Sequence, residues 1–132
     1  MPEACKTLSG AVEAHDLTVP RSGIPRLVAA MHHLAERHGL EVACFGHAGD
    51  GNIHVNLMSQ DAGRFESILP QVNADVVGTT LELGGSISGE HGTGCVKKKY
   101  LRQALGQTEL ALMQAIKGAI DPENLMNPGK IF

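Results

Sequence analysis

The segment around Asp50-Gly51 constrains the fold most, because it joins two stretches with the composition of β-strands. These stretches, Glu41 to Phe45 and Asn52 to Met58, predict an antiparallel pair, and an Asp-Gly dipeptide between strands is a strong signal for a tight hairpin. A symmetric turn centred on this dipeptide predicts that His54 lies directly opposite His47. The chain is therefore expected to contain an antiparallel sheet built around this hairpin.

Elements on both sides of the hairpin predict an α+β fold. Residues 15–19 predict a strand, and apolar residues at helical spacing predict a helix over 22–38, capped by Ser22 and ended by Gly39. After the hairpin, residues 61–83 predict a helix. The remaining expectations are a break in that helix at Pro70, a brief strand near 86–88, helices near 94–104 and 108–120, and a turn at Asn127-Pro128-Gly129. The order βαββαβ is that of a ferredoxin-like fold, an antiparallel sheet with helices on one face, here with two C-terminal helices added.

Alternation along the hairpin predicts an apolar face and a polar face. The set that includes Ile53 and Val55 is apolar and is expected to face the helices. The opposite set contains His47, His54 and Asn56. This face is open in a ferredoxin-like domain unless another domain covers it, so it is the candidate site.

Two neighbouring histidines on one sheet face could bind a metal ion together. A second glycine-rich segment, residues 84–94, contains Glu90 as a third ligand and His91 beside it. Three ligands leave coordination positions open, which is typical of a catalytic metal. The alternative is that the histidines are ordinary polar residues on a solvated face and that Glu90 and His91 belong to a loop that caps a helix.

Composition disfavours several classes of function. The chain of 132 residues has 11 Lys+Arg, 14 Asp+Glu and four aromatic residues, so neither a basic patch nor a base-stacking surface for nucleic acid is expected. No apolar run approaches the roughly 20 residues of a membrane helix. The three cysteines form no Cys-x-x-Cys pair, which favours a reducing compartment and predicts a cytoplasmic protein.

Three motifs carry a resemblance to a known family. They are HAGDGNIH at 47–54, GGSISGEHG at 84–92 and DPENLMNPGK at 121–130. With these motifs the chain closely resembles the C-terminal domain of FAD-linked oxidases of the vanillyl-alcohol oxidase superfamily, which includes glycolate oxidase, FAD-dependent D-lactate dehydrogenases and D-2-hydroxyglutarate dehydrogenase. The resemblance implies a divalent metal, zinc or manganese, bound by His47, His54 and Glu90.

The resemblance also implies an oxidoreductase that converts a small 2-hydroxy acid to a 2-oxo acid. In it His91 would act as the catalytic base, Asn56 would contact the substrate, and Asn127 would lie near the flavin. FAD would be bound mostly by a separate domain, and its electrons would pass to a quinone, a flavoprotein or a cytochrome. Relatives hold the substrate carboxylates with basic residues at positions that correspond to Cys5 and Ala14, so the particular 2-hydroxy acid is left open.

On this interpretation residues 1–132 form the C-terminal substrate and metal (cap) domain of such an enzyme. The FAD-binding domain is not part of this sequence, so the chain is expected to be inactive alone. Its uncovered sheet face is expected to favour a homo-oligomer. Two alternatives remain, a non-enzymatic ferredoxin-like binding module and a self-contained metal-dependent hydrolase in which His91 activates metal-bound water.

Overall fold

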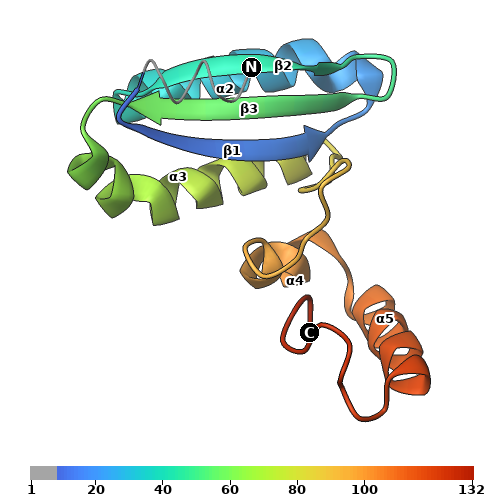
Figure 1. Ribbon diagram of the computed structural model, residues 1–132. Helices are drawn as coiled ribbons and strands as arrows, with labels where there is room; N and C mark the ends of the chain where they lie inside the picture. Colours follow the sequence, from blue (N-terminus) through green and yellow to red (C-terminus); the bar gives the residue numbers. More distant parts are fainter. Residues whose placement is uncertain (1–8) are drawn as a thin grey trace. The chain divides into compact units, whose positions relative to one another are not determined.

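The computed structural model describes residues 9–132, which divide into two compact units, the first up to residue 91 and the second over residues 92–132. The first unit is an antiparallel sheet of three strands with two helices (Figure 1). The strands are β1 (Ala11–Thr18), β2 (Glu41–His47) and β3 (Asn52–Ser59), and their order is β1-β3-β2. The α+β class predicted from the sequence is confirmed.

The hydrophobic core lies between one face of this sheet and the helices α2 (Ile24–His38) and α3 (Ala62–Glu82). Val55 and Leu57 are fully buried from the sheet side. The other face carries His54 and Asn56, as strand alternation predicts. The apolar and polar faces of the hairpin are therefore those expected from the sequence.

The predicted hairpin register is wrong by two residues. His54 pairs with Phe45, and His47 pairs with Asn52. The chain turns over residues 48–51, and Gly51 (φ 76°) accepts a hydrogen bond from the Val19 backbone N–H at 3.0 Å. This contact joins the turn to the end of β1, and the turn preference of an Asp-Gly dipeptide, which considers the hairpin alone, cannot predict it. Because the displacement is even, every side chain stays on its predicted face.

Helix α2 begins later than predicted. Ser22 does not cap it but lies in a short 3-10 helix, η1 (Arg21–Gly23), and the α-helix starts at Ile24 with Pro25 in its first turn. Pro25 suits this place because the first N–H groups of a helix have no partner within it. Gly39, with φ 63°, ends the helix as predicted.

Helix α3 is continuous, so the predicted break at Pro70 is wrong. Proline in a helix interior costs about 3 kcal/mol. Phe65 before it and Val72 and Val76 after it are buried in the same core, and each such side chain contributes about 1.5 to 3 kcal/mol. Burial on both sides therefore outweighs the local cost of Pro70.

The predicted strand at 86–88 is reduced to one bridge. Ser86 and Thr18 exchange two backbone hydrogen bonds, with N···O distances of 3.0 and 2.7 Å. After this bridge the chain leaves the sheet edge, and the ferredoxin-like arrangement stays a prediction.

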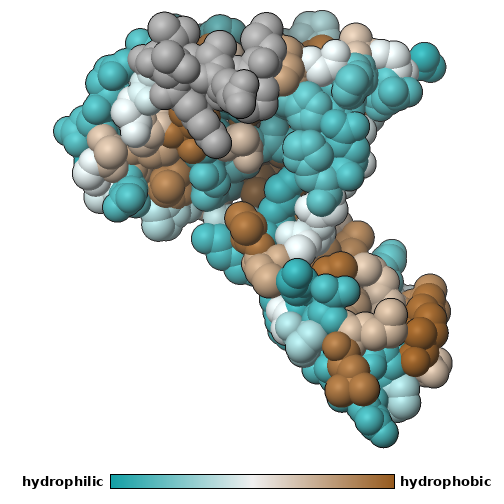
Figure 2. All heavy atoms as spheres, viewed as in Figure 1, coloured by the Kyte–Doolittle hydropathy of each residue, from teal (hydrophilic) through white to brown (hydrophobic). Residues whose placement is uncertain are grey.

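The second unit contains a 3-10 helix, η2 (Lys98–Tyr100), and the helices α4 (Leu101–Ala104) and α5 (Gln107–Ile120). The first predicted helix, 94–104, is therefore shorter than expected. The predicted turn is confirmed, because Lys130 N–H donates to the Asn127 carbonyl. Figure 2 shows apolar surface over α5, where Leu112, Ile116 and Ile120 are exposed. Among the described residues no helix has the length and apolar character needed to cross a membrane.

Candidate functional site

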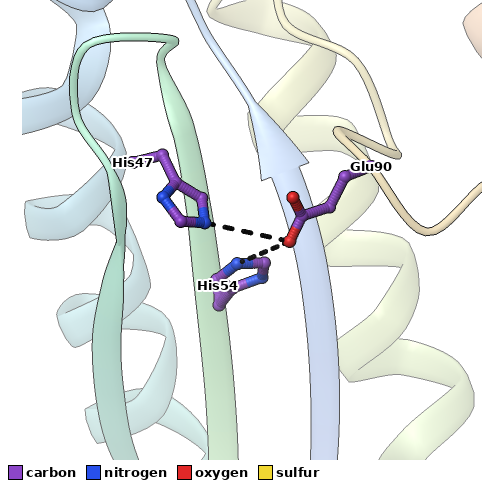
Figure 3. A group of neighbouring side chains, drawn as sticks. All are labelled: His47, His54 and Glu90. Carbon is purple, nitrogen blue, oxygen red and sulfur yellow. Dashed lines mark ion pairs between the residues drawn. The ribbon is translucent and has the colours of Figure 1, made fainter.

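Three predicted ligands meet on the sheet face that lies away from the helices (Figure 3). His47 ends β2, His54 lies in β3, and Glu90 lies in the loop that follows the Ser86 bridge. Glu90 Oε1 is 3.3 Å from His54 Nε2 and 3.9 Å from His47 Nε2. One ligand atom from each residue lies within 4.8 Å of the others, so the structure brings the three together although their predicted register was wrong.

His91 adjoins this cluster. Its ring stacks on that of His54 with centroids 5.4 Å apart, and its Nε2 is 3.6 Å from Glu90 Oε1. The side chain of His54 is 15% exposed, whereas those of His47, Glu90 and His91 are more than half exposed. The cluster therefore has one half-buried member, His54, and three exposed members that an incoming molecule can reach.

A pocket of about 230 Å³ lies beside the cluster on the same sheet face. His54 and His91 line it together with Phe45, Ala14 and the buried Asn56. Asn56 is thus placed beside the cluster, as the sequence predicted. Ala14 adds no positive charge to the pocket, and Cys5, the other position compared with basic residues of relatives, lies outside the described residues.

Asp16 is the residue of this site that sequence reasoning missed. It lies in β1 opposite His54, and it is 2% exposed. Its carboxylate accepts hydrogen bonds from the Asn52 side chain and the Ser88 hydroxyl, and from the backbone N–H groups of residues 89–91. An acidic residue inside a predicted strand was the available signal, because a buried charge requires partners.

These hydrogen bonds decide the ionisation of Asp16. Burial by itself raises the pKa of a carboxyl group, but the hydrogen bonds donated by the His91 amide, the Asn52 side chain and the Glu90 amide favour the charged form. Together they hold the pKa of Asp16 far below its usual range. A permanent negative charge therefore lies beneath the loop that carries Glu90 and His91.

Gly89 allows this loop to approach the sheet closely. A Cβ at this position would overlap the side-chain amide of Asn52 and would also lie 2.7 Å from the Thr18 hydroxyl. Glycine is therefore required here for space, which explains one of the glycines that flank Glu90 and His91 in the sequence.

Asn127 lies in the terminal turn of the second unit, with φ 50°. Its expected place near a flavin stays a prediction. Two of the lysines before α4 contact groups of the second unit: Lys98 donates to the Gly129 carbonyl, and Lys99 lies over the Tyr100 ring.

The donor set fits a divalent metal. Two imidazole nitrogens and one carboxylate oxygen are ligands that zinc and manganese accept, and three protein ligands leave positions open for another molecule. His54 already directs its Nε2 toward Glu90, which is the side on which a shared ion would sit.

Comparisons with known proteins agree with the motifs. Residues 1–131 match the family model described as FAD linked oxidases, C-terminal domain. The chain is 41% identical over 118 residues to glycolate oxidase subunit GlcD of Bacillus subtilis (strain 168), which covers 89% of this chain and 25% of that protein. It is 37% identical over 123 residues to D-2-hydroxyglutarate dehydrogenase of Stutzerimonas stutzeri (strain A1501), covering 89% and 26%. It is also 37% identical over 118 residues to D-lactate dehydrogenase of Anaerostipes hadrus, covering 88% and 25%.

The chain therefore belongs to the family of C-terminal domains of FAD-linked oxidases, and the resemblance inferred from its three motifs is confirmed. It spans about a quarter of the length of these relatives. Among solved structures, a C-terminal segment of the alpha subunit of aIF2 from Pyrococcus abyssi overlaps 61% of the chain and 52% of that segment, with a TM-score of 0.39 and 17% identity, and supports no argument about function.

Proposed function

We propose that this chain forms the metal and substrate site of an FAD-dependent dehydrogenase or oxidase of 2-hydroxy acids. The observation that carries the proposal is the convergence of ligand atoms of His47, His54 and Glu90 within 4.8 Å on the sheet face away from the helices, beside a pocket. Membership of the FAD-linked oxidase family supports the redox chemistry, and the names of the relatives suggest glycolate, D-lactate or D-2-hydroxyglutarate as the class of substrate.

The three ligands would hold zinc or manganese. Such an ion supplies Lewis acidity, which lowers the pKa of a bound hydroxyl group and orients a 2-hydroxy acid through its hydroxyl and carboxylate oxygens. His54 is the fixed member of the set because it is largely buried in the sheet. His47 and Glu90 are exposed and can adjust to the coordination geometry.

His91 would take the proton of the substrate hydroxyl. Its ring is held against His54 by stacking, yet it is exposed enough to touch a molecule that sits on the cluster. The hydroxyl O–H bond would break toward His91 while the Cα–H bond breaks with transfer of a hydride to the flavin, so that a C=O bond forms. The products would be a 2-oxo acid, protonated His91 and the two-electron-reduced flavin. Asn56 would contact the substrate from the floor of the pocket.

The hydride would pass to FAD, which supplies the two-electron acceptor of the reaction. In this proposal the flavin is bound mostly by a separate FAD-binding domain, Asn127 lies near it, and the electrons pass on to a quinone, a flavoprotein or a cytochrome. We propose a cytoplasmic location for the protein from its cysteine usage alone.

Metal titration of the purified chain tests the site. We expect one Zn²⁺ or Mn²⁺ per chain, and we expect His54→Ala to abolish binding. His33→Ala is the matched control, because His33 is an exposed histidine of α2 outside the cluster. Absence of stoichiometric metal in the wild-type chain, or equal binding by the two variants, would overturn the proposed metal site.

The redox part is tested with the chain joined to its FAD-binding domain. Glycolate, D-lactate and D-2-hydroxyglutarate are each added without oxygen, and the visible absorbance of the flavin is expected to bleach with at least one of them. His91→Ala is expected to slow this bleaching by about 100- to 10,000-fold. If none of the three acids bleaches the flavin, the proposed dehydrogenase activity is refuted. Hydrolysis of an ester or amide substrate by the metal-loaded chain alone would favour the hydrolase alternative instead.

A further inference from the structure

We propose that Asp16 is a positioning residue, which holds Glu90 and His91 over His54 and so assembles the metal site. This inference rests on the proposed function, because it assigns a role within that same site. Asp16 is neither a ligand nor a base in this scheme. It acts by fixing the loop that carries Glu90 and His91 and by orienting the imidazole ring of His54.

One carboxylate oxygen of Asp16 sets the path of the loop. Its Oδ2 accepts hydrogen bonds from three successive backbone N–H groups, those of Gly89 and Glu90 at 2.9 Å and of His91 at 2.8 Å, and from the Ser88 hydroxyl at 3.1 Å. Successive amides that converge on one oxygen define the direction of the backbone at each residue. The Cα atoms of Glu90 and His91 are therefore placed from the sheet.

The other oxygen of Asp16 faces the residues of the central strand. Its Oδ1 accepts a hydrogen bond from Asn52 Nδ2 at 2.7 Å and lies 3.8 Å from His54 Nδ1. With Nδ1 on the side of Asp16, His54 turns Nε2 toward Glu90. At 3.8 Å, Asp16 Oδ1 and His54 Nδ1 are too far apart for a hydrogen bond, so Asp16 acts on the His54 ring through its negative charge, which favours the orientation with Nδ1 toward Asp16.

Asp16 itself is held by the sheet. It lies within β1, paired with His54 of the central strand, and it is 2% exposed. Gly89, which has no room for a Cβ, keeps the loop at its closest approach to Asn52. One rigid carboxylate thus joins two segments that are far apart in sequence.

The test compares Asp16→Asn with Asp75→Asn in the purified chain. Asp75 also accepts several side-chain hydrogen bonds, from His38, Arg37 and Gln71, but it joins α2 to α3 outside the metal cluster. Co²⁺ is the probe, because its visible spectrum reports the coordination geometry, and Zn²⁺ competition gives the affinity. We expect Asp16→Asn to weaken binding by about 10- to 100-fold and to change the Co²⁺ spectrum. We expect Asp75→Asn to change neither.

A second measurement is made without metal. Amide hydrogen exchange of residues 89–91 is expected to be at least about 10-fold faster in Asp16→Asn and unchanged in Asp75→Asn, since exchange follows the loss of local protection. If the wild-type chain binds no metal, the proposed function fails, whereas this exchange measurement still decides the role of Asp16. Unchanged exchange at 89–91, or metal affinity equal to that of the wild type, would overturn the proposal.

Gly89→Ala covers the case in which Asp16→Asn does not fold. This variant keeps the carboxylate but forces the loop away from Asn52, so it is expected to weaken Co²⁺ binding in the same range. Gly78→Ala in α3 is its control, because a Cβ there meets nothing within 4 Å. Equal Co²⁺ affinity of the two alanine variants would count against a loop positioned in this way.

Discussion

Replacing Gly51 by alanine tests how the hairpin turn places His47. Gly51 has φ 76°, and its carbonyl accepts the Val19 N–H. A Cβ at this position would overlap the Val19 carbonyl oxygen, which is backbone and cannot rotate away. We therefore expect the turn to separate from the end of β1 and to carry His47 with it.

Two effects lower the stability of Gly51→Ala. The left-handed conformation of a non-glycine residue costs about 1 to 2 kcal/mol, and loss of the hydrogen bond to Val19 costs about 0.5 to 1.5 kcal/mol. Together they predict that Gly51→Ala lowers the free energy of unfolding by about 1.5 to 3.5 kcal/mol. Because His47 is one of three ligands, we expect weaker metal binding as well.

Urea unfolding measures the stability, and metal titration measures the site. Gly49→Ala is the matched control, because Gly49 lies in the same turn, has no positive φ, and a Cβ there meets nothing within 4 Å. Its free energy of unfolding is expected to change by less than about 0.5 kcal/mol. Equal effects of the two substitutions, or a nuclear Overhauser effect pattern that pairs His54 with His47 instead of Phe45, would refute this account of the turn.

Three further predictions concern the rest of the chain. Pro70→Ala is expected to stabilise the protein by about 2 kcal/mol, which is the cost of proline inside a helix less the entropy that proline removes from the unfolded chain. Pro25→Ala, in the first turn of α2, is expected to give no stabilisation, and equal effects of the two substitutions in urea unfolding would contradict a continuous α3. Burial raises the pKa of Asp75, but hydrogen bonds from His38 and Gln71 and the charge of Arg37 outweigh burial, so the pKa is lowered. The contribution of the Asp75 carboxylate to the stability of the fold is therefore present above the ordinary pKa of 3.8 and is lost as the pH falls through the lowered pKa. The stability difference between wild type and Asp75→Asn should accordingly shrink as the pH falls below about 4, and a difference independent of pH would be inconsistent with it. Sedimentation at high concentration is expected to show a dimer or a higher oligomer, because apolar side chains of α5 are exposed, and a strict monomer would contradict this.

The ligand set of the candidate site was accessible from sequence because it depends on residue type and on strand alternation. His47, His54 and Asn56 share a face whenever the hairpin loop has an even number of residues, and an even register error leaves that result intact. Glu90 and His91 were found through the glycines around them. Asp16 was missed because its role depends on a loop more than 70 residues away in sequence, as the hydrogen bond to the Glu90 amide shows.

The structure corrected those predictions in which a local preference competed with long-range packing. Pro70 breaks a helix in isolation, but the buried side chains before and after it keep α3 continuous. Asp50-Gly51 favours a turn centred on itself, but the contact of Gly51 with Val19 moves the turn. A strand near Ser86 is limited to one bridge, since the chain beyond it is bound to Asp16 instead of to a neighbouring strand.

By itself, then, the sequence determined the α+β class, the two faces of the hairpin, the identity of the candidate ligands and the family. These follow from periodicity and from residue chemistry, which act over a few neighbouring positions. Only the tertiary structure decided which atoms meet. The separation of Glu90 from His54, the orientation of the His54 ring and the burial of the Asp16 charge all depend on two distant segments that a single carboxylate holds together.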